Sequence, residues 1–281
     1  MRRAIYWFSG TGNSLAAAKG LQQALEGAER FPMAAGRTRL EAPCDHLILV
    51  FPVYAGGLPA PVTAFINHLD QGAVRRATVV VTHGGMPGLA ARMAAVLLAD
   101  KGIDDVAAHT IRMVDNYPPL GGPPPPAVCR QREAAAATRV AELGRRLAAA
   151  PVPAARPPSR ALRSLCLGLH ALHRKAFRGR DQAFRTTDAC TGCRICERIC
   201  PVANIKLMEG RPVWQGHCCA CFACYHACPA GAIRYGRRQK AARQYRHPAV
   251  VLDDLLDRIL CIDNPLEALA KPPGRCAYRP M

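Results

Sequence analysis

The chain has 281 residues, with 38 Lys and Arg against 20 Asp and Glu, so its formal net charge is +18. Half of the residues are apolar and 21% are charged, which excludes an intrinsically disordered chain and allows one large domain or two unequal ones. The chain also holds 14 Cys. In a reducing cytosol, closely spaced cysteines are more often metal ligands or redox groups than disulfides.

The longest uncharged run, residues 47–66, has the length that a bilayer requires, but three Pro and two adjacent Gly interrupt it. The apolar run within the first eight residues is shorter than the apolar core of a signal peptide. We therefore predict no membrane span and a cytoplasmic location.

Residues 1–150 alternate between strand-like and helical patterns, which is typical of a parallel sheet covered on both faces. The predicted strands are residues 4–8, 30–36, 47–53, 77–82 and 106–114. The predicted helices are residues 14–25, 61–69, 89–101 and 133–150. This part of the chain is therefore predicted to be an α/β domain.

A proline-rich, basic stretch separates this part from the rest of the chain. Residues 119–126 contain four consecutive prolines and are predicted to form a loop or an extended segment. Residues 151–158 are a second proline-broken linker. Residues 160–178 place leucines at helical spacing between basic residues. We expect this helix to pack on the body of the protein, with binding to a membrane surface as the alternative.

Cysteines beyond residue 189 form the strongest motif in the sequence. Two runs share the spacing C-x2-C-x2-C-x3-C, and each is followed by a proline: Cys190, Cys193, Cys196 and Cys200 before Pro201, and Cys218, Cys221, Cys224 and Cys228 before Pro229. With this spacing, three thiolates of a run bind one cubane and the fourth cysteine reaches the other. We therefore predict two 4Fe-4S clusters, one held by Cys190, Cys193, Cys196 and Cys228 and the other by Cys218, Cys221, Cys224 and Cys200.

Structural zinc is the alternative for any pair of C-x2-C motifs. Zinc needs four ligands in two pairs, whereas each run already has three cysteines at successive gaps, a fourth cysteine and a proline, which favours clusters. Six cysteines lie outside the pattern: Cys44, Cys129, Cys166, Cys219, Cys261 and Cys276. We expect these to be small buried apolar groups, including Cys219, which adjoins a predicted ligand.

The front of the chain carries a loop suited to a phosphate. Six small or polar residues join a predicted strand to a predicted helix: Ser9, Gly10, Thr11, Gly12, Asn13 and Ser14. Backbone N–H groups and hydroxyls at a helix N-terminus donate to phosphate oxygens, and the helix dipole favours the charge. No Lys or Arg occurs at 9–18, which suits a phosphomonoester held by neutral donors. A capped strand-to-helix turn without a ligand is the alternative.

Two further glycine-rich loops follow later predicted strands. Their candidate ligand-binding residues are Tyr54, Ala55, Gly56 and Gly57 in one loop and Thr82, His83, Gly84 and Gly85 in the other. Open α/β sheets bind ligands beyond the carboxyl ends of their strands, and glycines let the backbone approach a flat ligand. Residues 115–117 follow the last predicted strand and could line the same crevice, with a plain turn as the alternative.

These motifs resemble a known group of flavodoxin-ferredoxin fusion proteins. The matching stretches are residues 8–14, 51–59, 82–88 and 115–117 together with both cysteine runs. Residues 1–150 resemble a flavodoxin-like FMN domain with a doubly wound parallel sheet. Residues 186–236 resemble a small α+β ferredoxin domain with two clusters, and residues 151–185 and 237–281 are a basic linker and a basic C-terminal extension.

The resemblance implies that residues 9–14 bind the FMN phosphate and that the loops at Tyr54 and Thr82 flank the isoalloxazine. The segment between the second predicted strand and residue 47 is too short for a full helix with its loops, which departs from the flavodoxin pattern.

From these cofactors we expect an electron-transfer protein that couples one- and two-electron redox partners and has no catalytic side chains of its own. The alternative is an FMN-dependent reductase of a small substrate that the clusters supply with electrons. The net charge is +2 over residues 1–120, +9 over 121–189 and +7 over 190–281. This excess of basic residues suits acidic redox partner proteins, and a biased genomic composition is the alternative explanation. A redox-sensing nucleic-acid binder is less favoured, because the chain has no recognised nucleic-acid motif.

Overall fold

The computed structural model describes residues 1–149, 179–236 and 243–256, with isolated positions between 161 and 175. The predicted linker at 151–185 and the predicted extension at 237–281 therefore lie largely outside the described residues. The positions described between 161 and 175 are helical, and Leu165 and Leu172 among them are exposed. How that predicted helix packs lies outside the described residues. No helix of the described part is both long and apolar enough to cross a bilayer.

Five parallel strands form the main sheet, in the order β2-β1-β3-β4-β5. The strands are β1 (Arg3–Trp7), β2 (Glu29–Pro32), β3 (Cys44–Pro52), β4 (Val74–His83) and β5 (Val106–Arg112). This strand order is that of flavodoxin-like doubly wound sheets, so the predicted fold class is confirmed. Residues 47–51 of β3 are fully buried because helices cover both faces of the sheet.

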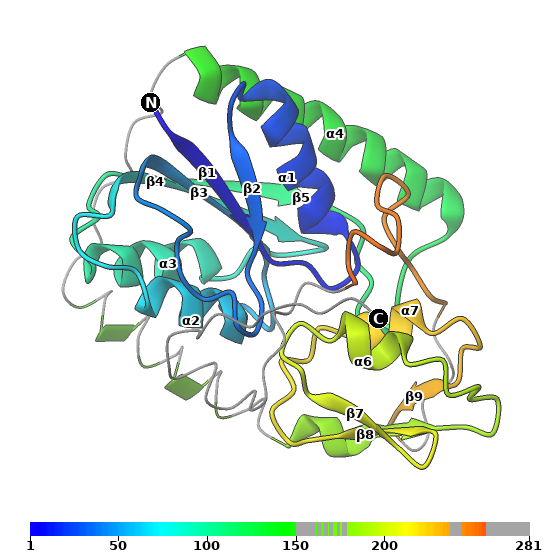
Figure 1. Cartoon of the computed structure of the whole chain (residues 1–281). Helices are drawn as coiled ribbons and strands as arrows, with labels where there is room; N and C mark the ends of the chain where they lie inside the picture. The colour runs from blue at the N-terminus through cyan, green and yellow to red at the C-terminus, as the bar shows by residue number, and fades with distance from the viewer. Residues whose placement is uncertain are drawn as a thin grey trace.

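Two helices cover each face, α1 and α4 on one side and α2 and α3 on the other (Figure 1). Their bounds are α1 (Asn13–Ala24), α2 (Ala60–Asn67), α3 (Ala90–Ala99) and α4 (Pro126–Ala149). Glycines let α1 and α4 approach closely. A Cβ on Gly20 would lie 2.7 Å from Val140, and one on Gly144 would lie 2.5 Å from Ala24.

The proline-rich segment before α4 is more ordered than its composition predicts. Pro118–Leu120 forms a short 3-10 helix, η1, where the prolines predict a loop or an extended stretch. α4 begins at Pro126 and not at the predicted residue 133. The reason is that the proline ring fixes φ near the helical value, and the first turn of a helix does not need the missing N–H.

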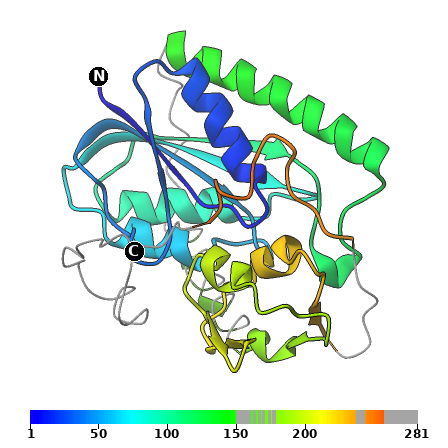
Figure 2. The same cartoon turned by 45° about the vertical axis from the view of Figure 1, so that its right-hand side comes forward.

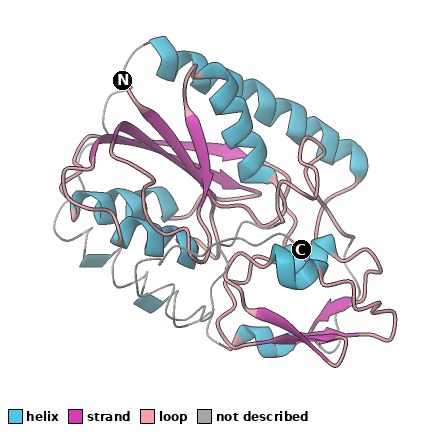
Figure 3. Ribbon diagram, in the orientation of Figure 1, coloured by secondary structure: helices cyan, strands magenta, loops and turns pink. Residues whose placement is uncertain are grey.

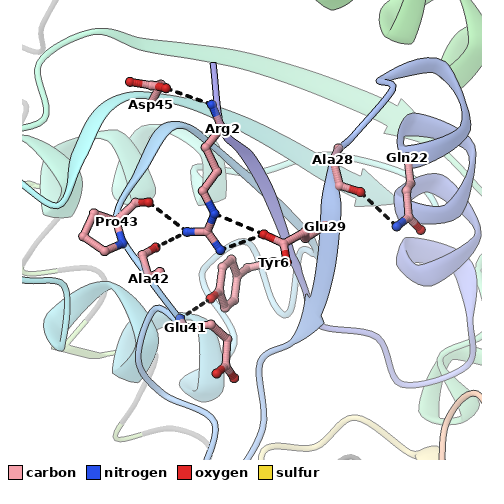
Figure 4. A network of polar contacts seen from close by, with 9 residues as sticks. All are labelled: Arg2, Tyr6, Gln22, Ala28, Glu29, Glu41, Ala42, Pro43 and Asp45. Carbon is pink, nitrogen blue, oxygen red and sulfur yellow. Dashed lines mark hydrogen bonds and ion pairs between the residues drawn. The ribbon is translucent and has the colours of Figure 1, made fainter.

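The connection from β2 to β3, residues 33–43, contains no helix, in agreement with its short length. Figure 4 shows the hydrogen bonds that hold it on the sheet. The guanidinium of Arg2 donates to two carbonyls of the connection and to the carboxylate of Glu29 on β2. The hydroxyl of Tyr6 on β1 accepts from the N–H of Glu41 at 2.7 Å. Polar contacts from the start of the chain thus anchor a segment that lacks a helix of its own.

The cysteine-rich region is a small α+β unit that contributes buried residues to both core clusters of the sheet (Figure 3). It has two antiparallel pairs of strands, β6 with β9 and β7 with β8, and two short helices. Its elements are η2 (Arg180–Ala183), β6 (Phe184–Thr186), α6 (Ile195–Ile199), β7 (Ile205–Met208), β8 (Arg211–Trp214), α7 (Ala223–Ala227) and β9 (Ile233–Tyr235).

Residues 243–256, hereafter the C-terminal strap, return from the cysteine-rich region to α1 (orange in Figure 2). At one end, the side chain of Gln244 donates to two backbone carbonyls of the second cysteine run. At the other end, Asp254 pairs with Lys19 of α1 at 2.6 Å, and Leu255 and Leu256 are buried in the core on that face. The strap therefore ties the two parts of the molecule together.

Candidate functional site

The loop between β1 and α1 lies at the carboxyl edge of the sheet and is buried throughout residues 9–14. Gly12 has φ 97°, a conformation that favours glycine, and its N–H donates to the hydroxyl of Ser9 at 3.0 Å. No described side chain caps the N-terminus of α1. The N–H groups of a first helical turn lack partners within the helix and can donate to an anion, so this loop offers the kind of donor that a phosphate uses.

Hydroxyl groups of the loop are oriented by neighbouring strands. Asn116, just after β5, donates its side-chain N–H to the Thr11 hydroxyl oxygen at 2.7 Å. The Thr11 hydroxyl hydrogen therefore has to point to another acceptor. The hydroxyls of Ser14 and Thr82 share one hydrogen bond at 2.7 Å, so one of these two groups keeps a hydrogen to donate. Thr82, at the end of β4, therefore contacts the loop between β1 and α1.

The C-terminal strap closes one side of the same loop. The Tyr245 hydroxyl lies 3.0 Å from both the side-chain oxygen of Asn13 and the carboxylate of Glu133, which share its one hydrogen, and the N–H of His247 donates to the carbonyl of Thr11 at 3.0 Å. The side-chain nitrogen of Asn13 donates to a backbone carbonyl after β5 at 2.9 Å. Both ends of the Asn13 amide are therefore used within the protein, and its backbone N–H is the group that remains to bind a phosphate.

The loops after β3 and β4 meet at this edge. The ring of Tyr54 packs edge-on against Phe8 with centroids 5.9 Å apart, and its hydroxyl would lie 3.0 Å from a Cβ on Gly10. Gly88 contacts Gly56 so closely that a Cβ on Gly88 would lie 2.5 Å from the Gly56 Cα. The three loops predicted to bind one ligand are therefore adjacent, and glycines make their close approach possible.

The remaining predicted residues of these loops differ in exposure. Ala55 and Gly85 are exposed, whereas Gly57 is buried. His83 is half-buried, its ring Nδ1 lies 2.8 Å from the Gly85 carbonyl, and burial lowers its pKa. Gly84 packs against the segment after β5, where a Cβ would lie 2.5 Å from another side chain. Residues 115–117 thus belong to the same edge, as the sequence indicates.

The second cysteine run lies directly on the first loop. The carbonyl oxygen of Cys221 would be 2.5 Å from a Cβ on Gly10. The Nε2 atom of His226, on α7, lies 2.9 Å from the carbonyl oxygen of Asn116. The Nδ1 atom of the same ring accepts from the N–H of Tyr245 at 3.1 Å. These partners require a neutral ring protonated at Nε2, and burial lowers the pKa of His226 to about 4.

Four of the predicted ligands line one cavity in the cysteine-rich region. We call them the outer thiol set: Cys190, Cys193, Cys196 and Cys228. Leu207 and Pro212 from the β7-β8 hairpin and Ile233 from β9 form apolar walls of this cavity. Cys193 is exposed and Cys196 is buried, so the cavity reaches from the interior to the surface. Its cysteines come from both runs, which is the crossed pairing that the spacing predicts.

The other four predicted ligands form the inner thiol set: Cys200, Cys218, Cys221 and Cys224. Burial, followed by the repulsion of the other thiols in this set, raises the pKa values of Cys218 and Cys224. Cys196 of the outer set also acts on Cys224, so the two sets adjoin. The N–H of Asn204 donates to the Cys200 sulfur and that of Ala220 to the Cys218 sulfur, each at 3.2 Å.

The geometry of these thiols bears on the zinc alternative. Within the described ranges, no three Cys, His, Asp or Glu side chains form a group that could hold a single metal ion. The ligands of a cubane bind different irons and need not converge on one point. Burial and the neighbouring thiols raise the pKa of Cys196 to about 11, so this thiol carries a proton that metal binding would release.

Cysteines outside the motif follow the expected pattern where they are described. Cys44, Cys129 and Cys219 are buried, and Cys219 lies beside the inner thiol set, next to Cys221. The remaining three lie outside the described residues: Cys166, Cys261 and Cys276.

The sequence does not indicate the contacts of the strap. Tyr245 is 232 positions from its partner Asn13, and His226 is 110 positions from Asn116. No local pattern marks such a pair. Only residue type could have drawn attention to these contacts. Tyr245 and His247 stand in an otherwise basic tail, and His226 stands between two predicted cysteine ligands.

No protein-family model matches the chain. An uncharacterized protein of Methanocaldococcus jannaschii is 38% identical over 55 residues, which are 20% of this chain and 21% of that protein. A subunit of the ion-translocating oxidoreductase complex of Methanosarcina acetivorans is 36% identical over 66 residues, which are 23% of this chain and 25% of that protein. The chain thus spans about a fifth to a quarter of the curated relatives it matches.

Solved flavoproteins show a remote likeness. An NAD(P)H:quinone oxidoreductase from Methanothermobacter marburgensis is 16% identical, with a TM-score of 0.37, over 52% of this chain and 98% of that chain. A flavodoxin from the domain Archaea is 12% identical, with a TM-score of 0.36, over 53% of this chain and 96% of that chain. The fold assignment rests on the strand order and not on these likenesses.

Proposed function

We propose that this chain is an electron-transfer protein that binds two 4Fe-4S clusters and FMN and passes electrons between them. When bound, the clusters carry single electrons and the flavin takes up two, which would couple one-electron and two-electron partners. The observation that carries the proposal is the grouping of eight motif cysteines into two adjoining sets of four, each drawn from both runs.

The chain's own residues would give the clusters different surroundings. The outer thiol set opens to solvent at Cys193, so it would exchange electrons with a partner. The inner thiol set adjoins the phosphate loop through Cys221 and Gly10, so it would exchange electrons with a ligand at the sheet edge. The β7-β8 hairpin shields the outer cavity with apolar side chains and would limit the access of water.

The residues at the sheet edge fit the phosphate of FMN. The uncapped N-terminus of α1, the left-handed Gly12 and the Thr11 hydroxyl supply neutral donors in a buried loop. Tyr54 and the glycines at 56 and 88 would border the flat part of the ligand. The C-terminal strap would hold this loop in place through Asn13 and Thr11.

The charge of the chain supports an acidic partner protein. The formal net charge is +18. Opposite charge steers a partner to a basic surface, and added salt screens the attraction. We expect the rate of electron exchange with an acidic ferredoxin or flavodoxin to fall as salt rises. A rate that does not depend on salt would refute this part of the proposal.

Anaerobic purification followed by reconstitution with iron and sulfide tests the cofactors. We expect the iron and sulfide content of two 4Fe-4S clusters per chain, cluster signals in electron paramagnetic resonance after reduction, and one extractable FMN. Zinc in place of iron would refute the clusters, and loaded protein without flavin would refute the FMN site. Steady turnover of a small substrate by the loaded protein would favour the reductase alternative over the carrier.

A further inference from the structure

Asp181, on η2, is a buried carboxylate that lies outside both cysteine runs. Its side chain is 2% exposed. The N–H of Gly216 donates to its Oδ2 at 2.7 Å, and the side chain of Asn204 donates to the same oxygen at 3.1 Å. Its Oδ1 is buried without a hydrogen-bond partner, and no described Lys, Arg or His forms an ion pair with it. A buried carboxylate without a counter-charge is costly, so its presence calls for a functional reason.

Asn204 connects Asp181 to the inner thiol set. Its side chain binds the carboxylate, while its backbone N–H donates to the sulfur of Cys200 at 3.2 Å. The charge of Asp181 also reaches Cys218, where it is the last of the causes that raise the thiol pKa, after burial, Cys221 and Cys200. The buried carboxylate thus acts directly on one inner ligand and contacts a second, Cys200, only through Asn204.

Carboxylates beside the outer thiol set have different surroundings. Asp188, two positions before Cys190, has a fully exposed side chain and pairs with Arg211 at 3.0 Å. Glu197 pairs with Arg194 at 2.8 Å. Water and Arg211 screen the charge of Asp188, and the pairing with Arg194 offsets that of Glu197, whose side chain is 24% exposed. The two sets thus differ in the negative charge that they experience.

Resting on the proposed function, we propose that the carboxylate of Asp181 lowers the reduction potential of the inner cluster below that of the outer cluster, so that the first electron to enter the pair stays on the outer one. Reduction adds one negative charge to a cluster, and a buried carboxylate linked to an inner ligand through Asn204 opposes that addition. At an effective dielectric constant of about 20, such a charge changes the equilibrium constant for reduction by about tenfold, which corresponds to 59 mV for one electron.

This difference has a consequence for the direction of transfer. An electron that arrives from the sheet edge meets the inner cluster first and moves downhill to the outer cluster. There it lies beside the exposed Cys193, where a docked partner could accept it. Asp181 would thus act as a positioning residue for the electron and would not touch the reacting atoms.

A stepwise dithionite titration of the loaded wild-type protein, followed by electron paramagnetic resonance, tests the order of reduction. The Cys193→Ser variant changes an outer ligand and so identifies the signal of the outer cluster. We expect the outer signal to appear first and the inner signal at a lower potential. Equal potentials in the wild-type protein would overturn the inference whether or not any variant folds, and so would an inner signal, identified with Cys193→Ser, that appears first.

Asp181→Asn tests the cause, because it removes the charge and keeps an oxygen that can accept from Gly216 and Asn204. We expect the potential of the inner cluster to rise by the equivalent of about tenfold in its reduction equilibrium and that of the outer cluster to stay the same. Asp188→Asn, at the exposed carboxylate, is the matched control and should shift neither potential.

The outcomes separate this inference from the proposed function. Intact clusters with unchanged potentials in Asp181→Asn would overturn the inference alone. A wild-type protein that holds no cubane clusters after reconstitution would overturn the proposed function, and the inference with it.

Discussion

The two candidate cofactor regions of this molecule are built in opposite ways. The thiol sets come from two short cysteine runs, and their ligands lie within residues 190–228. The sheet edge gathers Ser9, Tyr54, Thr82, Asn116 and Tyr245 from five separate segments. The first region has only short elements, whereas the second rests on a sheet covered by four helices. Local spacing groups the thiols, while strand order brings loops from distant parts of the chain together.

Removal of an inner ligand should produce the largest change. We expect Cys224→Ala to lose the inner cluster, so that the iron and sulfide content falls by about half, because three thiolates hold a cubane less well than four. Chemical analysis of the reconstituted protein measures this loss. Cys129→Ala, at a buried cysteine outside both sets, should keep the full content. Full iron content in Cys224→Ala would contradict the assignment of the inner thiol set.

A substitution at Gly10 should disrupt the contact between the β1-α1 loop and the second cysteine run. Gly10→Ala would place a Cβ 2.5 Å from the Cys221 carbonyl, so the two regions must shift apart. We expect the free energy of unfolding to fall by about 1–3 kcal/mol, as overpacked sites usually show. Urea denaturation of the loaded protein measures the change. Gly85→Ala is the control, because open space surrounds that glycine and its backbone is unstrained. Equal stability of the two variants would argue against this interface.

Acid should weaken the sheet region through His46. Burial, followed by the charges of Arg76 and Arg3, lowers the pKa of this histidine to about 4 in the folded protein, against 6.5 in the unfolded chain. The unfolded state therefore binds the extra proton between pH 6.5 and 4, and stability decreases as pH falls through this window. We expect a loss of roughly 1–2 kcal/mol at pH 5 from this group.

Denaturation of wild type and His46→Gln at pH 7 and pH 5 tests that loss, with His68→Gln as a control for replacing a histidine. The difference between the two pH values should be smaller in His46→Gln than in wild type. An identical pH dependence in the two proteins would show that His46 is not responsible.

The smallest expected effect concerns the strap. Tyr245→Phe removes one hydroxyl, which lies 3.0 Å from both Asn13 and Glu133. We expect a loss of about 1 kcal/mol in the free energy of unfolding and faster release of FMN, because the strap no longer holds the phosphate loop. Denaturation and flavin fluorescence measure the two effects. Val251→Ala, at an exposed position of the same strap, should leave both unchanged.

Much of the architecture follows from local pattern. Continuous apolar runs place β3 and β4, because a strand buried on both faces needs apolar residues at every position. The helices α1, α2 and α3 lie within a few residues of their predicted bounds. Local pattern misses the early start of α4 and the short helix at Pro118–Leu120, because proline, which breaks a helix in its interior, favours the first turn.

The sequence by itself determined which residues are the candidate ligands, since the cysteine spacing and the glycine-rich loop before α1 are local patterns that any chain with these residues would display. Only the tertiary structure decided how the two regions meet. Three contacts join residues that are far apart in the chain: Cys221 with Gly10, Tyr245 with Asn13, and Asp181 with Asn204 beside the inner thiols. Such contacts depend on the packing of the whole core, to which every element contributes and which no short pattern encodes.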